Sequence, residues 1–193
     1  MTDMADNRST DPDFELMDRL KAGDQSAMQA LYARHHQRLY RFIMRQIRDE
    51  MMAEDIVNDV FLDCWRQAGK FEGRSKVSTW LTSIGYNKSI SYLRKKREHQ
   101  MGDGQAEAMV DDADSQEDHV MKDDKGDKIK VAISQLSADH AAVIDLAYYH
   151  EMSVNEIAET LDVPANTVKT RLFHARKNLH EILVETGVDR GWP

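Results

Sequence analysis

The sequence predicts an all-α protein in which two small helical domains are joined by a flexible acidic linker, with a helix-turn-helix in the second domain. Apolar residues recur at helical spacing in both halves of the chain, and no stretch alternates as a half-buried strand would. The 193 residues include 3 prolines and 9 glycines, and 41% are hydrophobic, which is typical of a soluble helical protein. Between the halves, a run of acidic residues with few large apolar side chains predicts a linker.

The first domain is expected over residues 13–97, after a disordered N-terminus of residues 1–12. A short helix over residues 14–21 should be closed by Gly23. Asp24 can cap a longer helix, whose apolar positions are Met28, Leu31, Tyr32, Leu39, Phe42, Ile43 and Ile47.

The rest of the first domain is expected to be a helix, a loop and a second helix. Asp49 can cap the first of these, whose apolar side holds Ile56, Val57, Val60, Phe61, Cys64 and Trp65. Residues 70–76 contain Gly73 and several charges, which indicates a loop. Helical spacing returns over residues 77–97, with candidate core positions at Trp80, Leu81, Ile84, Ile90 and Leu93.

The acidic linker is expected over residues 98–127. It carries 11 Asp and Glu against 2 Lys, a balance of −9, whereas the whole chain carries −8. The remaining residues are therefore slightly basic when taken together. Residues 84–97, just before the linker, carry five Lys and Arg and no acidic residue.

The second domain is expected over residues 128–185, followed by a tail of residues 186–193. Its first helix should bury Ile129, Ile133 and Leu136. Ser137 can cap a further helix that runs to about His150.

A helix-turn-helix is predicted by residues 153–177, which read SVNEIAETLDVPANTVKTRLFHARK. Ser153 and Glu156 have the spacing of a capping box, and Pro164 suits the first turn of a second helix. That second helix has inward positions at Val168, Leu172 and Ala175, while residues 164–180 carry four Lys and Arg and no acidic residue. Such a helix predicts a surface that faces DNA. The alternative is a helical hairpin with a solvated basic side.

Two further surfaces have a marked charge pattern. The helix around residues 53–67 places Asp55, Asp59 and Asp63 four residues apart, along one ridge. This ridge is either a docking site for a basic partner or an ordinary solvated helix face. Residues 70–97 mix cationic and aromatic side chains, a combination that suits single-stranded or melted nucleic acid. The alternative is that the aromatic residues are core and the basic end is solvated.

The sequence argues against several other classes of protein. No apolar run is long enough for a membrane span and no signal-peptide pattern follows Met1, so we expect a cytoplasmic protein without membrane contact of its own. The single cysteine, Cys64, excludes an internal disulfide and is expected to be a buried thiol. The eight histidines show no metal-binding spacing, so we expect no catalytic site, no metal and no cofactor.

Three segments, in this order, resemble the extracytoplasmic-function (ECF) sigma factors, a family of bacterial RNA polymerase specificity subunits. AEDIVNDVFLDCWR at 53–66 resembles the family's polymerase-binding helix. FEGRSKVSTWLTSIGYNKSISYLRKKR at 71–97 resembles its promoter-melting and minus-ten segment, and SVNEIAETLDVPANTVKTRLFHARKNL at 153–179 resembles its minus-thirty-five helix-turn-helix.

The resemblance implies a protein that directs core polymerase to promoters and is held inactive by an anti-sigma factor. Its expected partners are core RNA polymerase (the β′ clamp and the β flap), promoter DNA and the anti-sigma factor. The implied polymerase contacts are Asp55, Asn58, Asp59, Phe61 and Asp63. The implied minus-ten contacts are Phe71, Lys76, Asn87, Lys88, Tyr92, Arg94 and Lys95. The implied minus-thirty-five contacts are Thr167, Lys169, Thr170, Arg171, Phe173, His174, Arg176 and Lys177.

Two rival functions fit part of the sequence. A decoy that binds an anti-sigma factor without touching DNA would not need the cationic faces. A helix-turn-helix regulator that acts without polymerase would leave the acidic ridge and the first domain without a role.

Overall fold

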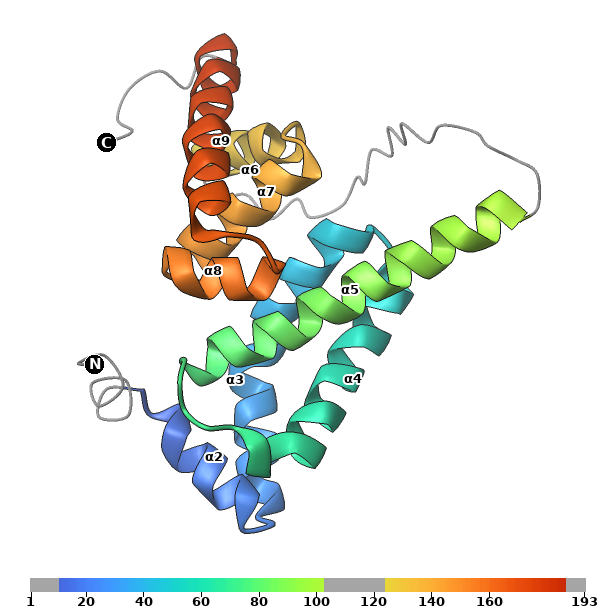
Figure 1. Cartoon of the computed structure of the whole chain (residues 1–193), viewed down its shortest axis with the longest axis vertical. Helices are drawn as coiled ribbons and strands as arrows, with labels where there is room; N and C mark the ends of the chain where they lie inside the picture. The colour runs from blue at the N-terminus through green and yellow to red at the C-terminus, as the bar shows by residue number, and fades with distance from the viewer. Residues whose placement is uncertain (1–10, 103–123, 187–193) are drawn as a thin grey trace.

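The computed structural model describes residues 11–102 and 124–186, and every regular element within them is helical. The N-terminal half contains α2 (Asp13–Lys21), α3 (Gln25–Ile47), α4 (Glu50–Gln67), the short 3₁₀ helix η1 (Ala68–Lys70) and α5 (Val77–Gly102). The C-terminal half contains α6 (Asp124–Ser134), α7 (Ala138–Ile144), the π-helix η2 (Asp145–Tyr149), α8 (Val154–Leu161) and α9 (Ala165–Glu185) (Figure 1).

Local capping fixes where several of these helices begin. The Asp24 and Asp49 carboxylates accept from the backbone N–H groups of Ser26 and Met52, at 2.8 and 3.1 Å, so both predicted caps are confirmed. Gly23 has a φ of +87°, a conformation that favours glycine, and it ends the turn after α2. Each cap satisfies backbone donors that the first helical turn leaves unpaired.

The predicted capping box also forms at the start of α8. Ser153 Oγ accepts from Glu156 N at 3.3 Å, and Glu156 Oε2 accepts from Ser153 N at 2.8 Å. After a turn with Asp162 in the left-handed region, α9 begins at Ala165, so Pro164 occupies the N-cap rather than the first turn.

We expect Ser153→Ala to lower the free energy of unfolding by about 1 kcal/mol, because one backbone donor of α8 loses its partner. Chemical denaturation of the full chain measures this loss. Asn155→Ala, an exposed substitution within the same helical turn, serves as control and should change stability little. Equal losses in the two variants would show that the cap contributes nothing of its own.

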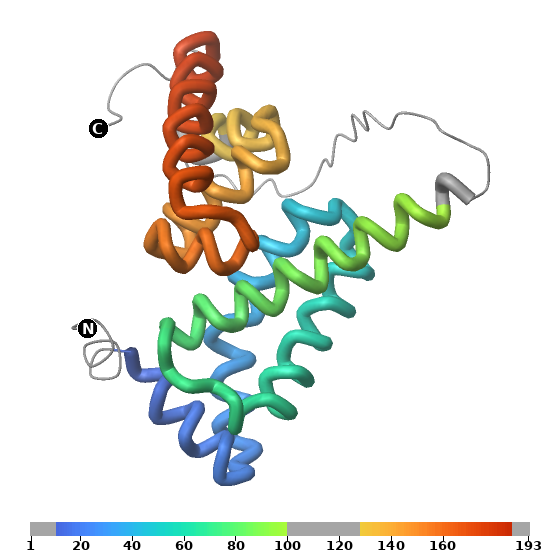
Figure 2. The backbone as a smooth tube through the Cα atoms, viewed as in Figure 1, coloured from blue at the N-terminus to red at the C-terminus, as the bar shows by residue number. Residues whose placement is uncertain are grey.

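The N-terminal helices pack around one apolar core. Fully buried side chains from three helices meet there, among them Leu31, Phe42, Val57, Val60 and Leu81. Gly85 lets α5 approach α3 closely, because a Cβ at this position would lie 3.0 Å from Leu39 Cδ1. The residues between η1 and α5 turn back beside α2 (Figure 2). There the Phe14 and Phe71 rings are 5.6 Å apart.

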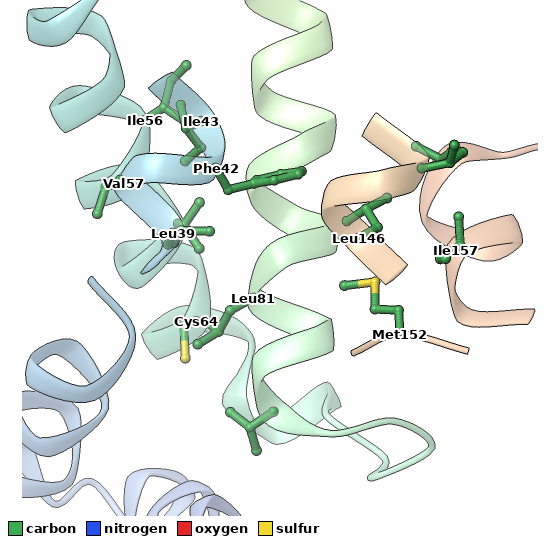
Figure 3. Packing of buried hydrophobic residues seen from close by; sticks show 14 of the residues in the cluster. Leu39, Phe42, Ile43, Ile56, Val57, Cys64, Leu81, Leu146, Met152 and Ile157 are labelled. Atoms are coloured by element: carbon green, nitrogen blue, oxygen red, sulfur yellow. The ribbon is translucent and has the colours of Figure 1, made fainter. Parts of the chain in front are cut away.

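The C-terminal helices pack around α9, which buries Val168, Leu172, Ala175, Leu179 and Leu183 against α6, α7 and α8. This confirms the inward positions predicted for the helix-turn-helix. The apolar core does not stop at the boundary between the two halves. In Figure 3, Leu39, Phe42 and Ile43 lie on one side of α5, and Leu146, Met152 and Ile157 lie on its other side.

Several segment boundaries expected from the sequence are wrong by a few residues. The predicted linker is helical at both ends, because α5 continues to Gly102 and α6 begins at Asp124; residues 103–123 lie outside the described part. No proline interrupts α5 beyond residue 97, and Arg94 pairs with Glu98 one turn later, so the helix has no reason to stop there.

The predicted N-terminal disorder also needs correction at its last residues. Asp11 Oδ2 accepts from Val77 N at 3.2 Å and so joins the N-terminus of α5, while residues 1–10 lie outside the described part, as do residues 187–193 of the tail. Two predicted core residues, Trp65 and Ile90, are about two-fifths exposed, at 40% and 41%. Both lie at the margin of an apolar stripe, where helical spacing does not separate core from surface.

Candidate nucleic-acid and protein interfaces

The acidic ridge, which consists of Asp55, Asp59 and Asp63, lies on α4 and is partly covered by α5. Asp55 and Asp59 are exposed, whereas the Asp63 side chain is 26% exposed. Lys88 of α5 reaches across to this ridge, with its Nζ 2.8 Å from Asp63 Oδ2 and 3.6 Å from Asp59 Oδ2. Burial alone would lower the pKa of Lys88, but the hydrogen bond and charge of Asp63, together with Asp59, outweigh it and raise that pKa.

An apolar groove borders the same helix. It has a volume of about 730 Å³ and lies between α3 and α4. Its lining includes Tyr32 and Asn58, whose Oη and Oδ1 are 3.5 Å apart, and the exposed Leu62 and Trp65. Phe61 is itself buried, with its ring 4.7 Å from that of Tyr32. Leu62 and Trp65 are not among the polymerase contacts that the resemblance implied, although both large apolar residues stand beside the ridge in the sequence.

Phe71, which the resemblance places against an extruded base, is only 6% exposed. Its ring lies 5.6 Å from that of Phe14 and 5.1 Å from that of Trp80. Trp80 is half-buried against the core, as predicted. Phe71 therefore anchors the loop before α5 in this arrangement and presents no free ring face to a base.

The other predicted minus-ten residues divide into two groups along α5. Near its start, Lys76 faces the C-terminal half, with its Nζ 3.8 Å from Glu151 Oε2. Farther along, Asn87, Arg94 and Lys95 are exposed, while Tyr92 is half-buried with its Oη 3.5 Å from Asp49 Oδ2. The structure thus gathers the exposed cations at the far end of α5, away from Lys76.

The predicted minus-thirty-five residues lie on α9, mostly on its outer side. The exposed members are Lys169, Thr170, Phe173, His174, Arg176 and Lys177. Thr167 and Arg171 are half-buried. Arg171 Nη2 lies 2.6 Å from Asp139 Oδ2 of α7, so this arginine is paired inside the domain.

Two polar clusters join the halves of the chain, and together we call them the interdomain seam. In the first, Arg45 of α3 donates two hydrogen bonds to the Asp145 carboxylate, at 2.9 and 2.6 Å. Asp145 is 2% exposed, and burial raises its pKa although the Arg45 charge acts to lower it. The Arg45 guanidinium also lies 5.3 Å from the centre of the Tyr149 ring.

The second cluster centres on His150, which is 4% exposed. Thr82 Oγ1 donates to Ser78 O at 2.9 Å and lies 3.0 Å from His150 Nδ1. Since the threonine hydroxyl has one proton, we infer that His150 Nδ1 carries the hydrogen and donates it to Thr82. His150 Nε2 is buried with no hydrogen-bond partner among the described residues. Burial, helped by the charges of Arg38 and Arg45, lowers the pKa of His150 to about 3.

The seam holds α8 against the first half of α5. Ser83 Oγ lies 2.7 Å from Thr160 Oγ1 of α8, and the Phe42 and His150 rings meet edge to face at 4.9 Å. No sequence pattern predicted these contacts, because Arg45 and Asp145 are 100 residues apart in the chain. As a result, the part of α5 nearest Lys76 faces the C-terminal half.

The described residues contain no group of three or more His, Cys, Asp or Glu side chains placed to hold a metal ion. Within residues 11–102 and 124–186, no helix has the length and apolar character that a membrane span requires. Cys64 is buried, as predicted, and burial raises the pKa of its thiol to about 12.

Comparison with known proteins gives matches over both halves. Residues 31–99 match the family model of sigma-70 region 2, and residues 126–179 match that of sigma-70 region 4. The chain is 30% identical to the ECF RNA polymerase sigma factor SigW of Bacillus subtilis, over 86% of this chain and 93% of that protein. It is 32% identical to the ECF RNA polymerase sigma factor SigL of Mycobacterium tuberculosis, over 88% of this chain and 96% of the relative.

Among the similar solved structures, two cover most of the chain. The sigma factor RpoE of Bartonella quintana, in complex with the anti-sigma factor NepR, has a TM-score of 0.65 and 29% identity, covering 84% of this chain and 98% of that one. CnrH in complex with the cytosolic domain of CnrY has a TM-score of 0.63 and 23% identity, covering 93% of this chain and 100% of that one, and it supports the fold alone.

Proposed function

Because this chain belongs to the ECF sigma factors, we propose that it binds core RNA polymerase through α4, promoter DNA through α5 and α9, and an anti-sigma factor in its inactive state. As an alternative sigma factor it directs promoter-specific initiation. Sigma factors are initiation factors, and we assign no catalytic step to this chain. The role places the protein in the bacterial cytoplasm, where the polymerase acts.

The polymerase-binding surface is the acidic ridge together with the groove beside it. The observation that carries the proposal is the position of Asp55 and Asp59, which are exposed next to the apolar Leu62 and Trp65. Apolar anchors flanked by charges are the usual composition of a protein interface. We assign the ridge to the β′ clamp, and the C-terminal domain to the β flap.

The minus-ten surface is the exposed part of α5 around Asn87, Arg94 and Lys95. Their amide and cationic groups suit a base edge and the backbone phosphates of melted DNA. Tyr92 and Lys88 border this surface. Phe71 is buried and would reach DNA only after a rearrangement, whereas Lys76 is 43% exposed and could exchange its weak pairing with Glu151 for a phosphate.

The minus-thirty-five surface is the outer side of α9. Lys169, Thr170, Phe173 and His174 are exposed near its N-terminal end, where a recognition helix meets base edges in the major groove. Arg176 and Lys177 come next along the helix, in a position that suits phosphate contacts. Thr167 and Arg171 sit closer to the domain interior, so we assign them a supporting role at the DNA.

The packed arrangement supports a free or inhibited state and not the promoter-bound one. With α8 on α5, the side of α5 that carries Thr82 and Ser83 faces protein instead of DNA. We infer that the two domains separate before both promoter elements are bound. The similarity to RpoE of Bartonella quintana, which was solved with the anti-sigma factor NepR, supports an anti-sigma partner for this chain too.

Run-off transcription with purified chain and bacterial core polymerase on a promoter library tests the function. We expect a discrete start site only when both are present, with shared sequence elements about ten and thirty-five positions upstream. High-affinity, sequence-specific binding by the chain alone would instead favour a regulator that acts without polymerase. A chain that binds an anti-sigma factor but never supports initiation would be a decoy.

Asp55→Lys is expected to weaken binding to core polymerase by about 2 kcal/mol, because it replaces an attractive charge with a repulsive one at the interface. Fluorescence anisotropy of the labelled chain, titrated with core enzyme, measures the change. Glu15→Lys reverses an exposed acid on α2 of the same domain and should leave the affinity near that of the parent chain. Equal affinities of both variants for core polymerase would show that the ridge is an ordinary solvated helix face.

A further inference from the structure

Lys88 was expected to contact DNA, yet in the structure its ammonium lies among the carboxylates of the acidic ridge. Its Nζ is 2.8 Å from Asp63 Oδ2, a hydrogen-bonding distance, and 3.6 Å from Asp59 Oδ2. The Lys88 side chain is 26% exposed, as is that of Asp63, so this ion pair is partly shielded from water. One residue thereby connects the two surfaces that the proposed function assigns to polymerase and to the minus-ten element.

We propose that Lys88 is the internal counter-ion of the acidic ridge, which core polymerase displaces from Asp59 and Asp63 and thereby frees toward promoter DNA. The inference rests on the proposed function, since it takes the ridge as the polymerase-binding surface. It adds a mechanism in which binding at one surface changes the charge at the other.

The three carboxylates of the ridge are held to different degrees. Asp55 is exposed and does not contact Lys88. The Asp59 side chain is 62% exposed, and its Oδ2 lies 3.6 Å from the Lys88 ammonium. The Asp63 side chain is 26% exposed and is hydrogen-bonded to that ammonium. A cationic partner surface therefore meets Asp55 first and Asp59 next. It gains Asp63 only by competing with Lys88. Each carboxylate that exchanges its partner weakens the hold on the lysine.

The release of Lys88 has an effect at the promoter-facing helix because of where the residue lies on α5. It comes directly after Asn87, which is exposed and is the proposed base contact. While it is paired with Asp63, the ammonium is neutralised by the ridge. Once displaced, it adds one unpaired positive charge beside the melted strand. Since coupling between two binding sites is reciprocal, polymerase binding should strengthen the minus-ten contact, and minus-ten DNA should strengthen polymerase binding.

This mechanism makes a prediction opposite in sign to that of a simple contact. Lys88→Met keeps the length and apolar stem of the side chain and removes its charge. In this variant, core polymerase does not have to displace a lysine from the ridge. We therefore expect it to bind roughly two- to fivefold more tightly at about 50 mM salt, a change of the size that a partly exposed ion pair contributes. A lysine that contacts polymerase or only braces α4 against α5 would give weaker binding on the same substitution.

The test measures core affinity by fluorescence anisotropy at low and at high salt. We expect the gain from Lys88→Met to shrink as salt rises, to be absent in Lys88→Arg, and to shrink when Asp63→Asn is already present. Lys96→Met, a charge loss at an exposed lysine of the same helix, is the matched control and should leave core affinity unchanged. Weaker or unchanged core binding by Lys88→Met, with Asp55→Lys still weakening it, overturns the counter-ion mechanism and leaves the proposed function standing. If Asp55→Lys has no effect either, the assignment of the ridge itself fails.

A second readout monitors the DNA side. A fluorescent single strand carrying the minus-ten element, found from the promoter library, is titrated with the free chain and with the chain bound to core polymerase. Lys88→Met should lower the affinity of the polymerase-bound form and leave that of the free chain unchanged, because only the bound form has a released ammonium. Equal losses in both forms would show that Lys88 contacts DNA whatever the state of the ridge.

Discussion

Replacing Arg45 by alanine is expected to shift the free protein from the packed arrangement toward one in which the two domains are apart. Asp145 is 2% exposed, and Arg45 donates both hydrogen bonds that its carboxylate receives from α3. Without the guanidinium, packing leaves a buried carboxylate unpaired. Truncating one partner of such a pair costs about 2 kcal/mol or more, a roughly 30-fold shift, and we take the lower end because the Arg45 side chain is 40% exposed.

Energy transfer between two dyes measures this shift directly. Cysteines introduced at the exposed Glu15 and Glu181 would carry the dyes, and the buried Cys64, whose thiol pKa is raised to about 12, should not react with them. Arg41→Ala removes an exposed arginine one turn earlier on α3 and is the control. An unchanged distance distribution in Arg45→Ala would mean that the apolar part of the contact holds the domains together without the ion pair.

Acid is expected to separate the two domains as well, through His150. In the packed arrangement the pKa of His150 is lowered to about 3, whereas in a separated domain it should titrate near its ordinary value of 6.5. The packed state therefore binds fewer protons. Its stability is fully present above pH 6.5 and is lost progressively as the pH falls toward 3. Between pH 7.5 and pH 5 the loss from this group should reach about 2 kcal/mol.

The physical reason is the environment of the imidazole. Its Nε2 is buried with no partner among the described residues, so a proton added there would be an unsatisfied donor beside the charges of Arg38 and Arg45. Asp145 acts in the opposite direction, because its raised pKa lets the packed state take up a proton more readily in acid. The same dye pair is therefore measured in His150→Gln, which keeps a hydrogen-bonding group but does not titrate. The difference between the two pH profiles isolates His150, and parallel profiles would contradict its role.

The features predicted best from the sequence are those set by neighbouring residues. Asp24, Asp49 and the pair Ser153 and Glu156 cap helices where expected, because a cap needs only residues two or three positions apart. The apolar spacing of Val168, Leu172 and Ala175 likewise placed the inner side of α9.

The roles of individual charged and aromatic residues could not be predicted in the same way. Phe71 and Asn87 have similar standing as candidate base contacts in the sequence, yet one is buried against Phe14 and the other is exposed. Lys88 belongs to a basic segment of the sequence, but its nearest charges are on α4. Burial and pairing of this kind depend on how helices pack against each other. A local sequence pattern does not show which residue of another helix will lie opposite.

The π-helix η2 sets how Asp145 and His150 are placed relative to each other. Its five residues begin with Asp145 and end directly before His150, so the two seam residues of the C-terminal half are joined by a segment wound more widely than an α-helix. A π turn holds one residue more than an α-helical turn, so winding these same residues as an ordinary α-helix would rotate His150 relative to Asp145 by about one residue step, roughly 100°. Asp145 and His150 could then no longer meet Arg45 and Thr82 together. Relatives that pack their domains in this way should therefore keep Asp145 and His150 together with the wide turn between them, whereas a relative with one residue fewer in this stretch would need an ordinary α-helical turn to bring the same two side chains to their partners Arg45 and Thr82.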